Sequence, residues 1–150
     1  MQTFLPYPDY EKSAQVLDWR RLGKQRVEAM QILNALRGST GWSKHPATLM
    51  WKGHEPQLAL YGLVICSEWR KRGYQDTLYP WFFEQYEPQL ILSASRPDWF
   101  GIDAIHASHR GRLLKKDPEW YGQFGWRDSP VDAVVYARDL KEVMPTESRI

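Results

Sequence analysis

Residues 19–38 carry basic and acidic side chains in a pattern that could support chemistry on a nucleic acid. Arg20, Arg21, Lys24, Arg26 and Glu28 fall within nine residues of one another. They could form only a solvated helix face, with Lys24 and Glu28 as an i,i+4 pair that stabilises the helix by ~0.3–0.5 kcal/mol. Alternatively, they could grip phosphates and hold an amine and a carboxylate beside a reacting sugar. Arg26 favours the second interpretation, because it falls beside the apolar stripe of the helix, where a cation needs a partner.

A second group of polar side chains recurs at helical spacing after residue 105. His106, His109 and Arg110 lie at offsets of zero, three and four, so they share one face of a helix, and Lys116 follows them. These side chains could contact phosphates or bases, or they could make structural hydrogen bonds. Two histidines three residues apart can also bind zinc, but one pair is weak evidence for such a site. We therefore expect no metal.

Two further histidines stand next to residues that constrain the backbone. His45 precedes Pro46, and His54 follows Gly53. A loop histidine is usually structural, but the glycine beside His54 indicates a tight backbone site that could lie near a ligand. Together with the histidines near residue 106, this pair leaves a metal-dependent nuclease or hydrolase open as one alternative function.

Hydrophobic periodicity predicts the helices that must position these side chains. The stripe of the first long helix consists of Leu22, Ala29, Met30, Leu33 and Leu36. Helices are expected at residues 10–17 after the N-cap Asp9, at 19–38 with Gly38 as C-cap, at 55–72 before Gly73, and at 101–116. Pro80 and Pro88 limit residues 77–92 to short helix and irregular chain. Alternating strand patterns are scarce, so the fold class is mainly α, in one compact domain over residues 1–150.

Composition excludes several classes of protein. The chain has 150 residues and a net charge of only +2, so any nucleic-acid footprint must come from the placement of charge. Its single cysteine, Cys66, excludes an internal disulfide and fits a reducing compartment. No run approaches the ~18 apolar residues of a membrane span, and residues 1–10 do not read as a signal peptide. We therefore expect a cytoplasmic protein. Phosphate-cradling glycine loops and nucleophile elbows are also missing from the sequence.

Four short segments match a family pattern in order across most of residues 1–126. They are Trp19-Arg20-Arg21-Leu22 with Arg26-Val27, His45-Pro46-Ala47-Thr48 through Gly53-His54, Glu68-Trp69-Arg70-Lys71-Arg72-Gly73-Tyr74 with Asp76-Thr77, and His106 through Tyr121, which ends in Pro118-Glu119-Trp120-Tyr121. Together they resemble the phage-type pyrimidine-dimer DNA glycosylases. The chain is most similar to a bacterial branch of that family that carries Arg-Leu-Gly-Lys-Gln-Arg-Val-Glu.

This resemblance implies a compact all-α enzyme that binds double-stranded DNA as a monomer, without a cofactor. It implies that the damaged nucleotide is flipped out of a kinked duplex, which costs a few kcal/mol. An amine then attacks the sugar C1′ to form a Schiff base, and β-elimination cuts the strand. The amine must be neutral, and an α-amine, with an ordinary pKa near ~7.7–8, suits that task better than a lysine near ~10.4.

The residue roles follow from the resemblance, position by position. The family uses the α-amine of a threonine exposed by removal of methionine. Here Gln2 follows Met1, and its long side chain disfavours that removal, so the α-amine is assigned to Met1, with Lys24 as the alternative. The family's catalytic glutamate aligns with Arg21. Glu28, two helical turns further on, replaces it as the carboxylate that stabilises positive charge on the sugar, and Asp18 is held in reserve.

The remaining candidate residues are assigned to DNA contact. They are Arg20, Arg21, Arg26, His45, His54, His106, His109, Arg110, Lys116, Trp120 and Tyr121. The two aromatic residues would touch the opened duplex, and the cations would grip phosphates. A non-catalytic nucleic-acid-binding domain on the same scaffold is the main alternative function.

Overall fold

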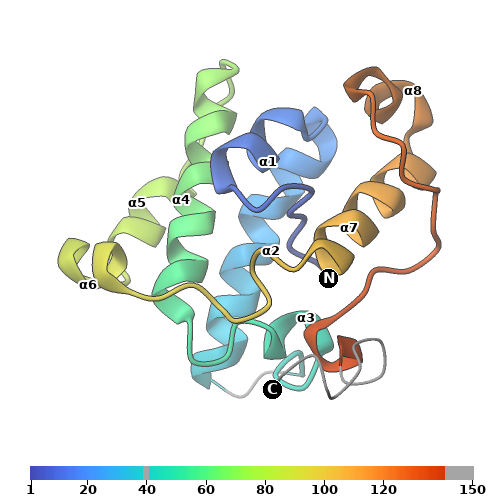
Figure 1. Ribbon diagram of the computed structural model, residues 1–150. Helices are drawn as coiled ribbons and strands as arrows, with labels where there is room; N and C mark the ends of the chain where they lie inside the picture. Colours follow the sequence, from blue (N-terminus) through green and yellow to red (C-terminus); the bar gives the residue numbers. More distant parts are fainter. Residues whose placement is uncertain (39–40, 141–150) are drawn as a thin grey trace.

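The computed structural model describes residues 1–38 and 41–140, and Figure 1 shows their arrangement. The helices are α1 (Tyr10–Val16), α2 (Trp19–Gly38), α3 (Pro46–Leu49), α4 (Glu55–Lys71), α5 (Leu78–Phe83), α6 (Pro88–Ser93), α7 (Asp103–Lys116) and α8 (Pro118–Tyr121), with short 3₁₀ turns at Gly122–Phe124 and Ala137–Asp139. Within these residues there is no β-strand. The expected mainly α fold class is confirmed.

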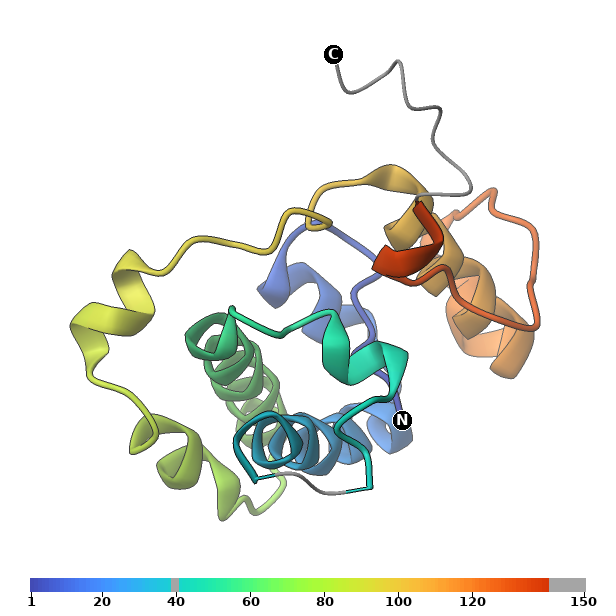
Figure 2. The same cartoon turned by 90° about the horizontal axis from the view of Figure 1, so that it is seen from below.

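Helices α2 and α4 pack side by side and form the centre of the core, as the end-on view in Figure 2 shows. Leu22 and Leu33 of α2 and Leu58 and Ile65 of α4 are completely buried. The apolar stripe that the sequence predicted for α2 therefore lies in the core. No helix of the described part of the chain combines the length and apolar character that crossing a membrane requires.

Arg26 has the partner that its place in the sequence requires. Its guanidinium lies 2.6 Å from the carboxylate of Asp76, whose side chain is completely buried. That carboxylate also accepts hydrogen bonds from the backbone N–H groups of Leu78 and Tyr79. Burial opposes ionisation of Asp76, but these hydrogen bonds and Arg26 together lower its pKa. Arg26 thus ties α2 to the start of α5, and a DNA contact by Arg26 would break this pair.

Gly62 is required where α4 meets α5. A Cβ atom at this position would lie 2.4 Å from the ring of Phe82, which is completely buried. We expect Gly62→Ala to lower the free energy of unfolding by about 1–3 kcal/mol, because the ring cannot withdraw without repacking. Urea unfolding measures the change. Gly122→Ala is the matched control, since no atom lies within 4 Å of its added Cβ. Equal stability of Gly62→Ala and the wild type would contradict this account of the packing.

The first six residues are held in extended form between α2 and α7. The N–H of Phe4 donates to Gln25 Oε1, and the N–H of Leu5 donates to His109 Nδ1. The carbonyl of Leu5 bonds the ring of His106, and Arg110 donates to the carbonyl of Pro6. The N-terminal segment is therefore held by α2 on one side and by α7 on the other (Figure 1).

The structure contains two short helices that the sequence patterns did not predict. Helix α3 starts at Pro46, and His45 caps it by accepting a hydrogen bond from the N–H of Ala47. Helix α8 starts at Pro118, and Asp117 caps it through the N–H of Trp120. Both helices have four residues, which is too short to show a hydrophobic period. The available signal was a capping residue followed directly by proline, which is favoured at the first position of a helix.

After α8 the chain turns back and lies along α7. Residues 128–136 of this return form what we call the C-terminal strap. The N–H of Val131 donates to the carbonyl of Gly111, and the N–H of Val135 donates to Ser108 Oγ. A Cβ at Gly111 would lie 2.5 Å from the carbonyl of Ser129, so only glycine lets the strap approach so closely.

Candidate active site

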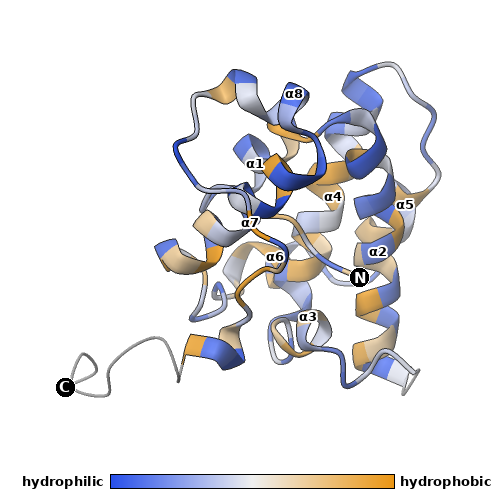
Figure 3. Cartoon of the chain, turned by 90° about the vertical axis from the view of Figure 1, so that its right-hand side faces the viewer, coloured by the Kyte–Doolittle hydropathy of each residue, from blue (hydrophilic) through white to orange (hydrophobic). Residues whose placement is uncertain are grey.

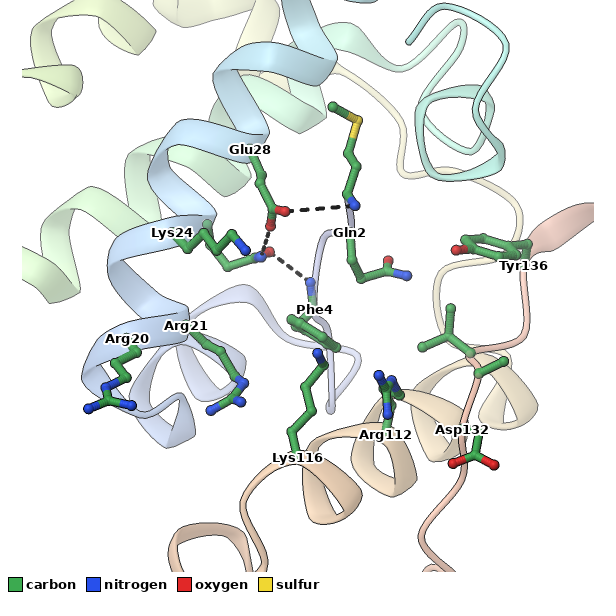
Figure 4. Close-up of a pocket in the computed structure, with 14 residues that line it drawn as sticks. Gln2, Phe4, Arg20, Arg21, Lys24, Glu28, Arg112, Lys116, Asp132 and Tyr136 are labelled. Carbon is green, nitrogen blue, oxygen red and sulfur yellow. Dashed lines mark hydrogen bonds and ion pairs between the residues drawn. The ribbon is translucent and has the colours of Figure 1, made fainter.

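Four segments of the chain enclose a cavity of about 450 Å³ (Figure 4). The N-terminal residues form its floor, the first three turns of α2 form one side, and α7 and the C-terminal strap form the other. It is lined by Met1, Gln2, Phe4, Arg20, Arg21, Lys24, Gln25, Glu28, Arg112, Lys116, Asp132, Ala133, Val134 and Tyr136. In Figure 3, which is seen from the side of α7 and α8, hydrophilic turns of α2 lie beside the N-terminus.

An amine and a carboxylate meet in this cavity. The amino nitrogen of Met1 lies 3.9 Å from Glu28 Oε1, and the side chains of the two residues are 3% and 13% exposed. The sequence pointed to these two residues for separate reasons. Met1 carries the α-amine, and Glu28 replaces the family's glutamate, whose position is occupied by Arg21. The structure brings them together.

Gln25 fixes the orientation of the Glu28 carboxylate. Its amide nitrogen donates to Glu28 Oε2 at 2.6 Å. Its amide oxygen accepts from the N–H of Phe4 and from the hydroxyl of Tyr61, at 2.9 and 2.8 Å. Since the oxygen is engaged by two donors, the amide cannot flip without losing both hydrogen bonds. The buried Tyr61 thus connects the carboxylate to the core of α4.

The environment of Glu28 makes its carboxyl group easier to protonate than that of a solvent-exposed glutamate. Burial raises the pKa of Glu28 above its ordinary value, and the Met1 amine, Lys24 and the Gln25 hydrogen bond only partly oppose this. A carboxyl group with a raised pKa can both donate and accept a proton in a reaction, and its ionised form stabilises a developing positive charge.

Five cationic side chains line the same cavity as the Glu28 carboxylate. They are Arg20, Arg21, Lys24, Arg112 and Lys116. Burial lowers the pKa of Lys116, and the neighbouring charges of Arg112, Arg21 and Lys24 lower it further. So many like charges in one place are unfavourable without an anion between them, and a phosphate backbone supplies such anions.

The two reserve candidates differ in their surroundings. Lys24 lines the cavity and interacts electrostatically with Glu28, so it remains a possible second amine. Asp18 is 5% exposed and is already engaged by the hydroxyl of Tyr121 and by Arg21, at 3.1 Å. Burial opposes its ionisation, but these partners lower its pKa. Asp18 therefore holds the start of α2 in place.

His106 and His109 lie in the core, each 1% exposed, so neither can reach a DNA strand in this arrangement. Both rings bond the backbone of Leu5, and His106 also accepts from the N–H of Gly101. His109 accepts through Nδ1, so its proton is on Nε2, which has no partner among the described residues. These histidines hold the N-terminal segment.

Four other residues that were assigned from the sequence to DNA contact also lie outside the cavity. Arg110 is paired with Asp128 at 2.8 Å, and Tyr121 is completely buried. His45 caps α3, and His54 lies at the start of α4 with Nδ1 3.3 Å from the carbonyl of Ser95. Of the residues assigned from sequence, those that line the cavity are Met1, Arg20, Arg21, Lys24, Glu28 and Lys116. Within the described part of the chain, no three His, Cys, Asp or Glu side chains gather as metal ligands would.

Trp120 borders a second hollow next to the cavity. This hollow, of about 380 Å³, shares Arg20, Arg21 and Lys116 with the first. Trp120 is 37% exposed, and its indole nitrogen donates to the carbonyl of Val16. Trp19, which is 54% exposed, stands on the same rim. Two exposed indoles beside a cationic cleft can stack on bases.

Sequence reasoning missed several cavity residues. They are Gln2, Phe4, Gln25, Arg112, Asp132, Ala133, Val134 and Tyr136. A signal existed for Gln25, because a glutamine within the apolar stripe of α2 needs a buried partner, as Arg26 does. Tyr136 had no such signal, since only the fold of the strap brings it to the N-terminus.

The buried His109 makes stability depend on pH. Burial lowers the pKa of His109 to about 3, whereas an unfolded histidine binds a proton near ~6.5. Between these values the unfolded chain holds one more proton, so lowering the pH destabilises the fold by up to ~1.4 kcal/mol per pH unit. Burial lowers the pKa of His106 as well, which increases the slope.

We therefore expect the free energy of unfolding, measured in urea, to fall between pH 7 and pH 5. Asp18 and Asp76, whose pKa values are lowered, contribute only at more acidic pH. His109→Asn keeps an acceptor for the N–H of Leu5 and should flatten the dependence. A stability that does not change over this range would show that the ring is charged or solvated.

Comparison with known proteins adds one finding. A family model described as pyrimidine dimer DNA glycosylase matches residues 1–79, which is 79 of the 150 residues. No curated protein and no solved structure matches the chain. The matched stretch contains Met1, Lys24 and Glu28, while α7 and the C-terminal strap, which form the opposite side of the cavity, lie beyond it.

Proposed function

Because this chain belongs to the pyrimidine dimer DNA glycosylase family, we propose that it excises a damaged pyrimidine from duplex DNA and can then cut the strand at the abasic site. Met1 would supply the nucleophilic amine, and Glu28 would supply the carboxylate. The observation that carries the proposal is the 3.9 Å approach of these two groups inside a cavity bordered by cations.

In the first step, the lone pair of the Met1 nitrogen forms a bond to C1′ of the damaged nucleotide. The bond between C1′ and the base breaks, and the base leaves with that electron pair. The proton lost by the amine passes through Glu28 to the base, which a carboxyl group with a raised pKa can do. Before this exchange, the ionised Glu28 stabilises the positive charge that develops on the sugar.

The strand cut follows from the same covalent bond. The nitrogen lone pair opens the sugar as the bond from C1′ to O4′ breaks and O4′ takes up a proton, which gives the Schiff base. Loss of a proton from C2′ then expels the 3′-phosphate by β-elimination. No cofactor enters this scheme, and the residues that perform it all come from one copy of the chain.

The cations of the cavity would bind the phosphates next to the extruded nucleotide. Arg20, Arg112 and Lys116 line the cavity, and Figure 4 shows them below Glu28, on the side of α7 and the first turn of α2. Trp19 and Trp120, on the adjoining rim, would stack on bases of the opened duplex. The residues that line the cavity come from positions between Met1 and Tyr136 of one chain. We therefore propose that the chain acts as a single domain and as a monomer.

The test uses duplexes that contain either a thymine dimer or an abasic site. The proposal predicts release of the damaged base, strand cleavage, and a covalent adduct after reduction with borohydride. Increasing salt should weaken DNA binding steeply, with about 0.9 counterions released for each phosphate contacted. Salt-dependent binding without base release or adduct on either duplex would instead show a non-catalytic DNA-binding domain.

A further inference from the structure

The short helix α3 contacts the first residue of the chain, although none of its four residues lines the cavity. The hydroxyl of Thr48 donates a hydrogen bond to Met1 Sδ over 3.7 Å, and Thr48 is completely buried. The side chain of Met1 is 3% exposed and packs against the core. Helix α3 lies next to the N-terminus in two perpendicular views (Figures 1 and 2). The thioether of Met1 is therefore held by α3, while the amine of the same residue lies beside Glu28.

A second side chain of this part of the chain holds the residue after Gln2. The indole of Trp51, which is completely buried, donates a hydrogen bond to Thr3 Oγ1 at 3.0 Å. On the other side, the N–H of Phe4 donates to Gln25 of α2. The backbone that follows Met1 is thus fixed by residues 48–51 and by α2 together.

This anchoring determines where the α-amine points. The Cα of Met1 carries the amine, the side chain and the carbonyl group. When the side chain and the carbonyl group are both held, the direction of the amine follows. A methionine side chain has three rotatable bonds, so it would sample several rotamers without a partner for its sulfur. Displacing a reacting group by about 1 Å can cost about 100-fold in rate, so a contact that restricts these rotamers affects the chemistry.

We infer that Thr48 is a positioning residue, whose hydroxyl holds the Met1 thioether and thereby directs the α-amine toward the reaction site next to Glu28. This inference rests on the proposed function and adds a residue that acts through Met1 rather than on the DNA. It accounts for a methionine as the residue that bears the amine, because the side chain of a serine, alanine or threonine in its place could not extend as far as Thr48.

The first experiment removes the hydrogen-bond donor. Thr48→Val keeps the shape of the side chain without the hydroxyl, and Thr48→Ser keeps the hydroxyl. For Thr48→Val we expect the rate of borohydride trapping on abasic duplex, at saturating protein, to fall about 5-fold to 10-fold with unchanged DNA affinity. Thr48→Ser should stay within about 2-fold of the wild type. Thr77→Val is the matched control at the exposed start of α5, where the side chain makes no capping hydrogen bond.

The second experiment removes the acceptor. Protein made with norleucine in place of methionine carries a CH₂ group where Met1 has its sulfur. The other methionines change as well, but they change equally with and without the hydroxyl at position 48, so a double-mutant cycle isolates the pair. In the norleucine protein, Thr48→Val should alter the trapping rate by less than about 2-fold, because the hydrogen bond is already absent.

The outcomes separate this inference from the proposed function. If the wild-type protein forms no adduct, the proposed function itself fails. If it does, a wild-type rate for Thr48→Val would overturn the positioning role. The same loss in the methionine and norleucine proteins would also overturn it, because Thr48 would then act through another contact. Should Thr48→Val fail to fold, Thr48→Ala takes its place in the cycle, with the same coupling to the sulfur expected.

Discussion

Replacing Glu28 by glutamine should lower the single-turnover rate of base release by about 100-fold to 1,000-fold, with little change in DNA affinity. Removal of one preorganised electrostatic group has effects of this size. Glutamine keeps an oxygen that can accept from Gln25, whose amide lies 2.6 Å from the carboxylate, so the site should stay assembled. It cannot carry the negative charge or exchange the proton. Quenched-flow measurement on a thymine-dimer duplex gives the rate, and filter binding gives the affinity.

Glu84→Gln is the matched control, because it makes the same change on the exposed end of α5, outside the cavity. Its rate should equal that of the wild type. If Glu28→Gln retained full activity, the carboxylate would have to be another group. Parallel loss of activity and affinity would mean that Glu28 organises the DNA-binding surface rather than the chemistry.

Converting the α-amine of Met1 to a ketone by transamination should reduce adduct formation on abasic DNA by at least about 1,000-fold, as loss of a nucleophile does. This modification leaves the length of the chain unchanged, which matters because the Met1 side chain is 3% exposed and an added residue would displace it. Borohydride trapping, quantified on a denaturing gel, measures the effect.

Lys24→Met tests the alternative amine under the same conditions. It lines the cavity, so we expect a moderate loss through weaker phosphate binding, about 10-fold, but continued adduct formation. The reverse result, full trapping by the transaminated protein and none by Lys24→Met, would transfer the nucleophile to Lys24.

The fold was largely predictable because its long helices have strong hydrophobic periods. The stripe of α2 predicted which face of this helix is buried, and Arg26 beside that stripe predicted a buried partner, which is Asp76. The short helix α3 and the C-terminal strap were not predictable in the same way. Their positions depend on individual hydrogen bonds, such as the one from the N–H of Val131 to the carbonyl of Gly111. Such hydrogen bonds produce no repeating pattern in the sequence.

The candidate site was predictable only where its residues share a helix. Lys24, Glu28 and the arginines at the start of α2 were found because helical spacing places them on neighbouring faces. His106 and His109 also share a face, but that face turns inward to bind the backbone of Leu5. Periodicity cannot distinguish a polar face that binds a ligand from one that binds another segment of the same chain. Gln2 and Tyr136 are far apart in the sequence and line the same cavity, which only the structure could show.

The most direct test of the account identifies the nitrogen that bonds to the sugar. The protein is reacted with abasic duplex, reduced with borohydride and digested with nuclease and trypsin, and the modified peptide is sequenced by mass spectrometry. We predict that the sugar remnant is attached to the amino nitrogen of Met1, in the peptide of residues 1–12. A remnant on Lys24 in the peptide of residues 22–26, or on Lys116 in that of residues 116–127, would contradict the pairing of Met1 with Glu28 as the reacting groups.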